Sequence, residues 1–261
     1  MLLYSSDGLM FATLDGGKTF LQVVKDYKKL FTSPAIPKND EIATEARRDA
    51  DERLTEPELL PEKQCCQLKE DNRPSGPMYL NNANQISQIT SINSKFDQDV
   101  NKFADVYNAN KNIYEAIANE AGVPPELVAI LHYRENTPDF LNSTFGIYLH
   151  NGQMLGSPTT IVPVGKNFNN FHDAAVDAFK DKNSLINTLQ LCYHSRDEVA
   201  ILTFAEAYNG DGYFKMGVVS PYLYSGTNLY TKGLYTSDGK YDPNAVEARP
   251  GVYLLLKAIM P

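Results

Sequence analysis

The sequence lacks several features that would point to a common class of protein. It contains no tryptophan, only three cysteines and no apolar run of membrane-spanning length. Cys65 and Cys66 are adjacent and Cys192 is far along the chain. Adjacent cysteines rarely pair because the bridge would be strained, and no metal-binding spacing is present. We therefore expect free thiols, as in a reducing compartment, and no metal site.

Basic residues are also in deficit. Lys and Arg number 24 against 32 Asp and Glu, a formal net charge of -8. Nucleic-acid binding needs clustered Lys and Arg, so this balance argues against a nucleic-acid partner. No phosphate-binding loop or dinucleotide fingerprint occurs, and we expect no cofactor. The beginning of the chain has no basic segment and too short an apolar stretch for a signal peptide. We expect synthesis in the cytoplasm, with action on other material after lysis or as part of a particle.

Composition divides the chain into three regions. Residues 1–33 hold short apolar pieces around a turn signal and form a small N-terminal segment, a possible docking piece. Residues 34–80 are rich in proline and charged residues and poor in aromatic ones. Such a segment buries too little apolar surface to order itself, which predicts a charged linker or a partner-wrapping arm. Residues 81–261 have the apolar periodicity of a folded domain.

The third region has an α+β pattern. Apolar residues at helical spacing predict helices over about 96–121 with a break near 108–110, and over 124–135, 170–182, 197–206 and 251–259. Between them, an Asn-Gly pair with β-branched residues on both sides predicts a small hairpin or β-lined loop within 146–164. The predicted fold is a mostly helical domain with a small β-hairpin region, preceded by the charged linker.

The helix over 124–135 is apolar and ends on a carboxylate. Val128 and Leu131 recur at helical spacing and place Glu135 on the same, buried face. Burial raises the pKa of a carboxyl group, and a general acid must be protonated near neutral pH. The alternative is a glutamate that is neutralised by an arginine or that caps a helix end. The helix over 197–206 repeats the arrangement with Glu206 and continues into Tyr-Asn-Gly.

This order of a helix ending in glutamate, a β region and a later Tyr-Asn-Gly resembles the goose-type lysozyme and soluble lytic transglycosylase superfamily. The resemblance is closest to a lysozyme-like branch of phage and prophage genomes, and it covers about residues 95–261. The segments that carry it are 132–135 (HYRE), 149–152 (LHNG), 208–213 (YNGDGY) and 220–228 (SPYLYSGTN). One departure is Asn136, which stands where a serine usually follows the catalytic glutamate.

The resemblance implies a lysozyme-like fold that cleaves the glycan strands of peptidoglycan, with Glu135 as the acid. Cleavage of a glycosidic bond needs an acid at the leaving oxygen and a group that stabilises the oxocarbenium-like centre. Candidates for a second carboxylate are Glu206, Asp139 and Asp211. We favour Glu206, although an ion pair from Glu206 to Arg134 or Arg196 is nearly as well supported. In many relatives no second carboxylate exists, or the sugar's own N-acetyl group takes its place.

Substrate-binding residues are predicted from the same segments. Tyrosine rings stack on sugar faces while their hydroxyl groups form hydrogen bonds. The resemblance places Tyr208 and Asn209 beside the acid. The remaining predicted substrate contacts are Tyr148, His150, Asn151, Asp139 and Tyr213.

Two classes of function follow. The first is a peptidoglycan-cleaving enzyme, a hydrolase or a lytic transglycosylase, that is carried by a phage or an injection particle. The second is a non-catalytic component of such a particle that binds glycan or has a structural role. In either case the expected partners are peptidoglycan and, through residues 1–77, other proteins of a phage tail or contractile injection particle.

Overall fold

The computed structural model describes residues 2–4, 10–12, 74–136, 139–142, 144–237 and 239–260. The chain forms two units, Met1–Leu59 and Leu60–Pro261. In the first unit, β1 (Leu2–Tyr4) pairs antiparallel with β2 (Met10–Ala12). The rest of the predicted N-terminal segment, and the predicted linker as far as residue 73, lie outside the described residues.

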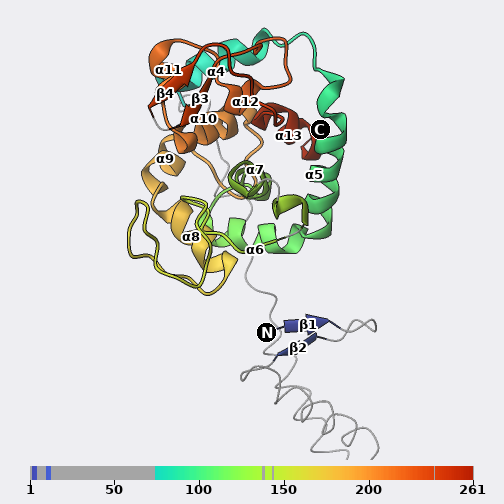
Figure 1. Cartoon of the computed structure of the whole chain (residues 1–261), viewed down its shortest axis with the longest axis vertical. Coiled ribbons are helices and arrows are strands. Elements are labelled where there is room, and N and C mark those ends of the chain that lie inside the picture. The colour runs from blue at the N-terminus through green and yellow to red at the C-terminus, as the bar shows by residue number, and fades with distance from the viewer. Residues whose placement is uncertain are drawn as a thin grey trace, which may run out of the picture. The chain divides into compact units, whose positions relative to one another are not determined.

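The second unit is mostly helical with a small two-stranded antiparallel sheet, which confirms the α+β class (Figure 1). Its elements follow in chain order: α4 (Pro77–Ser87), η2 (Ser94–Phe96), α5 (Asp97–Ala109), α6 (Lys111–Ala121), α7 (Pro125–Asn136), η3 (Asp139–Asn142), α8 (Phe171–Lys180), α9 (Asn183–Thr188), α10 (Glu198–Asn209), α11 (Gly212–Met216), α12 (Pro221–Tyr224), β3 (Leu234–Ser237), β4 (Lys240–Asp242) and α13 (Val252–Ile259). Helix α4 begins inside the range that was assigned to the linker.

Local signals fix the ends of several helices. The side chain of Asn170 accepts a hydrogen bond from the amide of Asp173 at the start of α8, and Asp197 accepts one from Ala200 at the start of α10. These side chains satisfy amide groups that have no partner within the helix. Gly122 ends α6 in the left-handed conformation, which favours glycine. The predicted break in the helix over 96–121 is confirmed at Asn110.

Helix α7 is the centre of the second unit. It contacts α6, α10, α13 and η3, and Figure 1 shows it nearly end-on among the surrounding helices. All of its residues are buried except Glu135, which is partly exposed. The prediction of a single buried face is therefore wrong, because helices pack on every side of α7. Glu135 is the position where this buried helix meets solvent.

The sheet does not lie where the sequence predicts a hairpin. Within 146–164 a single antiparallel bridge joins Ile147 to Met154, while the described two-stranded sheet pairs β3 with β4. In the predicted hairpin the Oε1 atom of Gln153 accepts hydrogen bonds from the amides of Thr160 and Ile161, each at 2.9 Å. A side chain thus replaces the backbone partners that a second strand would supply, and the segment is a loop.

Cys192 corrects another prediction. It is disulfide-bonded, so the expectation of free thiols is wrong for this residue. Its amide also donates a hydrogen bond to the hydroxyl group of Ser195 at 2.8 Å. Disulfides persist in oxidising compartments rather than in the cytoplasm.

Two further features are absent from the described ranges. None of their helices is both long enough and apolar enough to cross a bilayer. The same ranges contain no group of three or more His, Cys, Asp or Glu side chains arranged to hold a metal ion.

Candidate active site

Glu135 lies at the C-terminal end of α7 and is held there by one hydrogen bond. The hydroxyl group of Tyr222 donates to its Oε1 atom at 2.9 Å. Burial raises the pKa of Glu135 above its usual value, and the hydrogen bond and the positive charges of Arg134 and Arg249 offset only part of this effect. The carboxyl group is therefore biased toward the protonated form that a general acid requires.

Tyr222 comes from the short helix α12, which begins at Pro221 and is buried throughout. The guanidinium group of Arg134 lies over its ring, 4.4 Å from the ring centroid, in a cation–π contact. Burial raises the pKa of Tyr222 well above its usual value, and the nearby Glu135 raises it further. The hydroxyl group therefore stays protonated and remains a hydrogen-bond donor to Glu135.

Arg134 and Arg249 share a different carboxylate. Nη2 of Arg134 lies 2.9 Å from Oε2 of Glu247, and Nη2 of Arg249 lies 3.0 Å from the same oxygen. Nε of Arg249 also donates to Oε1 of Glu247 at 3.1 Å. Burial alone would raise the pKa of Glu247, but the bonds from Arg249 and the charge of Arg134 hold it at about 2. Arg134, which precedes Glu135, is thus paired with Glu247, and the described contacts of Glu135 include no ion pair with an arginine.

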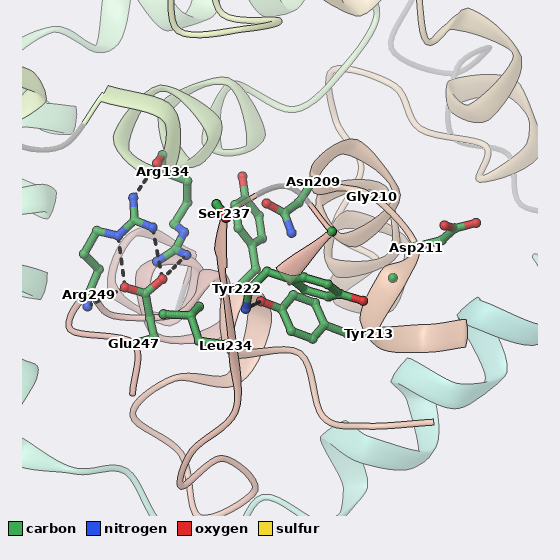
Figure 2. Close-up of a pocket in the computed structure, with 13 residues that line it drawn as sticks. Arg134, Asn209, Gly210, Asp211, Tyr213, Tyr222, Leu234, Ser237, Glu247 and Arg249 are labelled. Carbon is green, nitrogen blue, oxygen red and sulfur yellow. Dashed lines mark hydrogen bonds and ion pairs between the residues drawn. The ribbon is translucent and has the colours of Figure 1, made fainter. Parts of the chain in front are cut away.

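A cavity of about 490 Å³ opens beside this cluster. Its walls come from Arg134, the segment 209–213, Tyr222, the β3–β4 hairpin and the segment that carries Glu247 and Arg249. In Figure 2 the ion cluster lies on the left, Tyr213 and Asp211 lie toward the right, and Tyr222 is drawn between them. Because Tyr222 lines the cavity and also bonds Glu135, it connects the cavity to the candidate acid.

The Tyr208–Asn209 pair ends α10 on the side of this cavity. Asn209 is exposed and lines the cavity. Tyr208 is partly buried, and its hydroxyl group donates to the carbonyl oxygen of Leu149 at 2.8 Å. Burial raises the pKa of Tyr208 well above its usual value, and the charge of Glu135 adds to the effect. The two residues therefore have different surroundings: Asn209 faces the cavity, and Tyr208 ties α10 to the loop after Gly146.

That loop contacts the end of α7. A Cβ atom added to Gly152 would lie 3.6 Å from the carbonyl oxygen of Glu135. His150 is partly exposed, and its ring stacks near that of Tyr148 with the centroids 5.8 Å apart. Its Nε2 atom is 3.9 Å from Oδ2 of Asp181. His150 is thus the predicted loop residue that remains partly exposed, next to the rings of Tyr148 and Tyr208.

The other two predicted loop residues are engaged within the fold. Tyr148 is buried, and its hydroxyl group donates to Asp177 at 2.7 Å. Asn151 accepts a hydrogen bond from the amide of Gln153 at 3.1 Å and donates to the carbonyl oxygen of Ile161 at 3.3 Å. These bonds shape the loop, so a direct contact from either residue to a substrate would compete with them.

Tyr213 forms part of the cavity wall. It is buried, and its hydroxyl oxygen accepts a hydrogen bond from the amide of Tyr235 at 3.0 Å. The two rings meet edge to face with their centroids 5.1 Å apart. A Cβ atom on Gly212 would lie 3.1 Å from the ring of Tyr235, so a glycine lets the hairpin approach this closely.

Two of the three candidates for a second carboxylate, Glu206 and Asp211, have different surroundings. Glu206 is buried, accepts a hydrogen bond from Nδ2 of Asn82 at 2.9 Å, and is absent from the cavity lining. Burial raises its pKa. Asp211 does line the cavity, and it pairs with Lys215 at 2.7 Å. The side chain of Asp139, at the start of η3, lies outside the described part of the chain.

The alternative partners of Glu206 have other contacts. Arg134 pairs with Glu247, and Nη1 of Arg196 lies 3.8 Å from Oε2 of Glu126. Among the described residues, the side chain of Glu206 accepts its hydrogen bond from Asn82 on α4. Asn82 bonds Glu206 and Thr203, and the hydroxyl group of Tyr224 donates to Oδ1 of Asn82 at 2.9 Å. This network joins α4, α10 and α12.

Sequence reasoning missed three residues of the site. Tyr222 lies in the segment SPYLYSGTN, so a signal for it was present although no role was assigned. Glu247 and Arg249 lie in an irregular segment with no motif. Comparison of the chain with protein-family models, with characterised proteins and with solved structures gives no match.

Proposed function

We propose that this protein cleaves the glycan strands of bacterial peptidoglycan with Glu135 as the general acid. One observation carries the proposal: burial raises the pKa of Glu135, and its carboxyl group accepts a hydrogen bond from Tyr222, which lines a cavity of about 490 Å³. Glu135 itself is not part of the cavity lining. A group of this kind beside a cavity is a candidate catalytic residue on physical grounds. The resemblance of four sequence segments to lysozyme-like enzymes supports the same role.

The proposed chemistry requires one proton and one nucleophile. Glu135 gives its proton to the glycosidic oxygen as the bond from the anomeric carbon to that oxygen breaks, and an oxocarbenium-like centre develops. Water then adds to this centre and gives a reducing sugar, or the sugar's own 6-hydroxyl group adds and gives a 1,6-anhydro product. The proton that the attacking water or hydroxyl group loses restores the carboxyl group of Glu135, directly or through solvent. Asp211 on the cavity wall, or the N-acetyl group of the substrate, would stabilise the positive centre.

The cavity walls suit a saccharide. Tyr213, Tyr222 and Tyr235 supply aromatic surface, and Asn209 supplies an exposed amide. A mixture of aromatic faces with a few polar groups is typical of sites that bind sugars and other small polar molecules. We therefore propose that these residues bind the sugar rings of the substrate.

The disulfide at Cys192 supports action in an oxidising environment, outside the cytoplasm. Delivery as part of a phage-like particle would also avoid the slow encounter between a chain of net charge -8 and an anionic wall. Residues 1–77 would then attach the enzyme to other particle proteins. A second candidate function, binding of glycan without cleavage, uses the same cavity.

Clearing of purified cell walls in a zymogram, run at several pH values, separates these two functions. The proposal expects clearing by the wild-type protein and none by Glu135→Gln, which keeps the size of the side chain and removes its acidic proton. Glu115→Gln is the matched control, because Glu115 is exposed on α6 and pairs with Lys111 away from the site. Binding to the walls without clearing at any pH would favour the non-catalytic function.

A further inference from the structure

Glu247 binds both Arg134 and Arg249, the two arginines whose charges act on Glu135. Its side chain is buried, and both of its oxygens accept hydrogen bonds from arginine. Arg249 in turn donates from Nη1 to the carbonyl oxygen of Arg134 at 2.9 Å, which fixes it against the end of α7. Arg134 also donates to the carbonyl oxygen of Pro250 at 2.9 Å. The carboxylate of Glu247 therefore holds the guanidinium groups of Arg134 and Arg249 at the end of α7, close to Glu135 in the sequence.

The two arginines are the positive charges that act on Glu135 within the described residues. Both favour its ionised form. The other groups that face Glu135 are Tyr222 from α12 and Tyr208 from α10, and both tyrosines are neutral because burial keeps their pKa values well above the usual value. The charges that act on Glu135 are therefore those of the two arginines, and Glu247 is the carboxylate that both arginines bind.

Glu247 also acts on the geometry of the acid. It holds Arg134, the guanidinium group of Arg134 covers the ring of Tyr222, and the hydroxyl group of Tyr222 donates to Oε1 of Glu135. Because a donor already occupies Oε1, the acidic proton of Glu135 belongs on Oε2. Each contact in this series is direct, and none of them involves a substrate.

We propose that Glu247 is a positioning residue for Glu135: it binds both nearby arginines, which fixes their place at the end of α7 and limits how far they stabilise the carboxylate form of Glu135. The inference rests on the proposed function for its meaning in catalysis, but it makes a statement about Glu135 that is independent of any substrate. Removing the negative charge of Glu247 should favour ionisation of Glu135, and removing one of the arginines should disfavour it.

The test is a pH titration of Glu135 in the full-length protein, followed by NMR of ¹³C-labelled glutamate carboxyl groups. The signal is assigned by its absence in Glu135→Gln. We expect Glu247→Gln to lower the pKa of Glu135 by about one unit, a tenfold change in proton affinity. Arg249→Gln should raise the pKa, and the double variant should return it toward the wild-type value. Arg196→Gln is the control, because Arg196 is exposed and pairs with Glu126.

The test gives a decision even if one of the variants does not fold. Glu247→Gln leaves two cations without a counter-ion and is the variant most at risk. Arg249 is partly exposed, so Arg249→Gln is the safer one. If Glu247→Gln does not fold, Arg249→Gln decides alone: a raised pKa supports the proposal, and an unchanged or lowered pKa overturns it. An unchanged or raised pKa in folded Glu247→Gln overturns it as well.

Wall cleavage by the same variants separates this inference from the proposed function. If the protein is an enzyme, the loss of activity at high pH should begin at lower pH in Glu247→Gln and at higher pH in Arg249→Gln. A purely structural role for Glu247 would lower the amount of active protein without moving the profile. If the NMR shifts appear and no variant or wild-type protein cleaves walls, the positioning role stands and the proposed function fails.

Discussion

Tyr222 donates a hydrogen bond of 2.9 Å to Glu135, a residue 87 positions earlier in the chain. The contact joins the end of the central helix α7 to the short helix α12 and lies beside the cavity. It gives the candidate acid a fixed orientation. The other carboxyl oxygen of Glu135, Oε2, does not take part in this hydrogen bond.

Tyr222→Phe tests the orientation of the acid. The change removes a hydrogen bond that favours the carboxylate, so the pKa of Glu135 should rise further. Wall cleavage should fall about fivefold, in line with the net free energy of about 1 kcal/mol for one hydrogen bond. Tyr253→Phe on α13 is the control, because its ring packs near Lys257. Equal rates for Tyr222→Phe and the control at all pH values would show that this hydrogen bond has no role in catalysis.

Glu206→Gln distinguishes a catalytic role of Glu206 from a structural one. Glutamine can accept the bond from Asn82 through its carbonyl oxygen, so the network of α4, α10 and α12 should survive. We expect the activity per folded molecule to stay within about threefold of wild type, because this difference is below the worth of one typical hydrogen bond. Complete loss of cleavage by a folded variant would identify Glu206 as the second carboxylate after all.

The same variant has a predicted effect on stability. Burial raises the folded-state pKa of Glu206, so the stability that the protonated group contributes is full below the unfolded pKa of about 4.3. This contribution is lost as the pH rises through the folded value. Glu206→Gln should therefore match wild type near pH 4 and melt at a higher temperature than wild type near pH 8. Thermal unfolding at the two pH values checks the sign, and a lower melting temperature at pH 8 contradicts it.

Asn209→Ala tests the cavity as a binding site. Asn209 is exposed at the end of α10, so its loss should leave the melting temperature nearly unchanged. If its amide bonds the glycan, cleavage should fall about tenfold. Tyr208→Phe is the informative companion, because it removes the bond to Leu149 and should lower stability as well. A stability loss in Asn209→Ala with normal activity per folded molecule would make Asn209 a turn residue only.

Local sequence signals predicted most of the longer helices, including the apolar helix that carries Glu135, but not the residues that contact Glu135. Asn170, Asp197 and Gly122 are capping residues, and their effect depends on a few neighbouring amides, so the sequence shows it directly. The raised pKa of Glu135 followed from the apolar helix that carries it. Short-range periodicity was therefore enough for these features.

Features that depend on distant contacts could not be predicted in this way. The ion pair of Arg134 with Glu247 joins residues 113 positions apart, and the segment around Glu247 has no motif that would indicate it. The sequence predicts a small hairpin or a β-lined loop within 146–164, and one antiparallel bridge, Ile147 with Met154, forms there. The bonds from the amides of Thr160 and Ile161 to the side chain of Gln153 are not evident from β-branched composition. The burial of Glu206 was predicted, but its partner Asn82 lies 124 positions away on α4.

The most direct test of Glu135 as the acid is mass spectrometry of purified peptidoglycan after incubation with the wild-type protein and with Glu135→Gln. We expect soluble muropeptides from the wild type, with either a reducing end or a 1,6-anhydro end, and none from a folded Glu135→Gln variant. The muropeptide masses also identify whether water or the 6-hydroxyl group is the nucleophile. Release of the same products by Glu135→Gln at a rate within a few-fold of wild type would contradict the account.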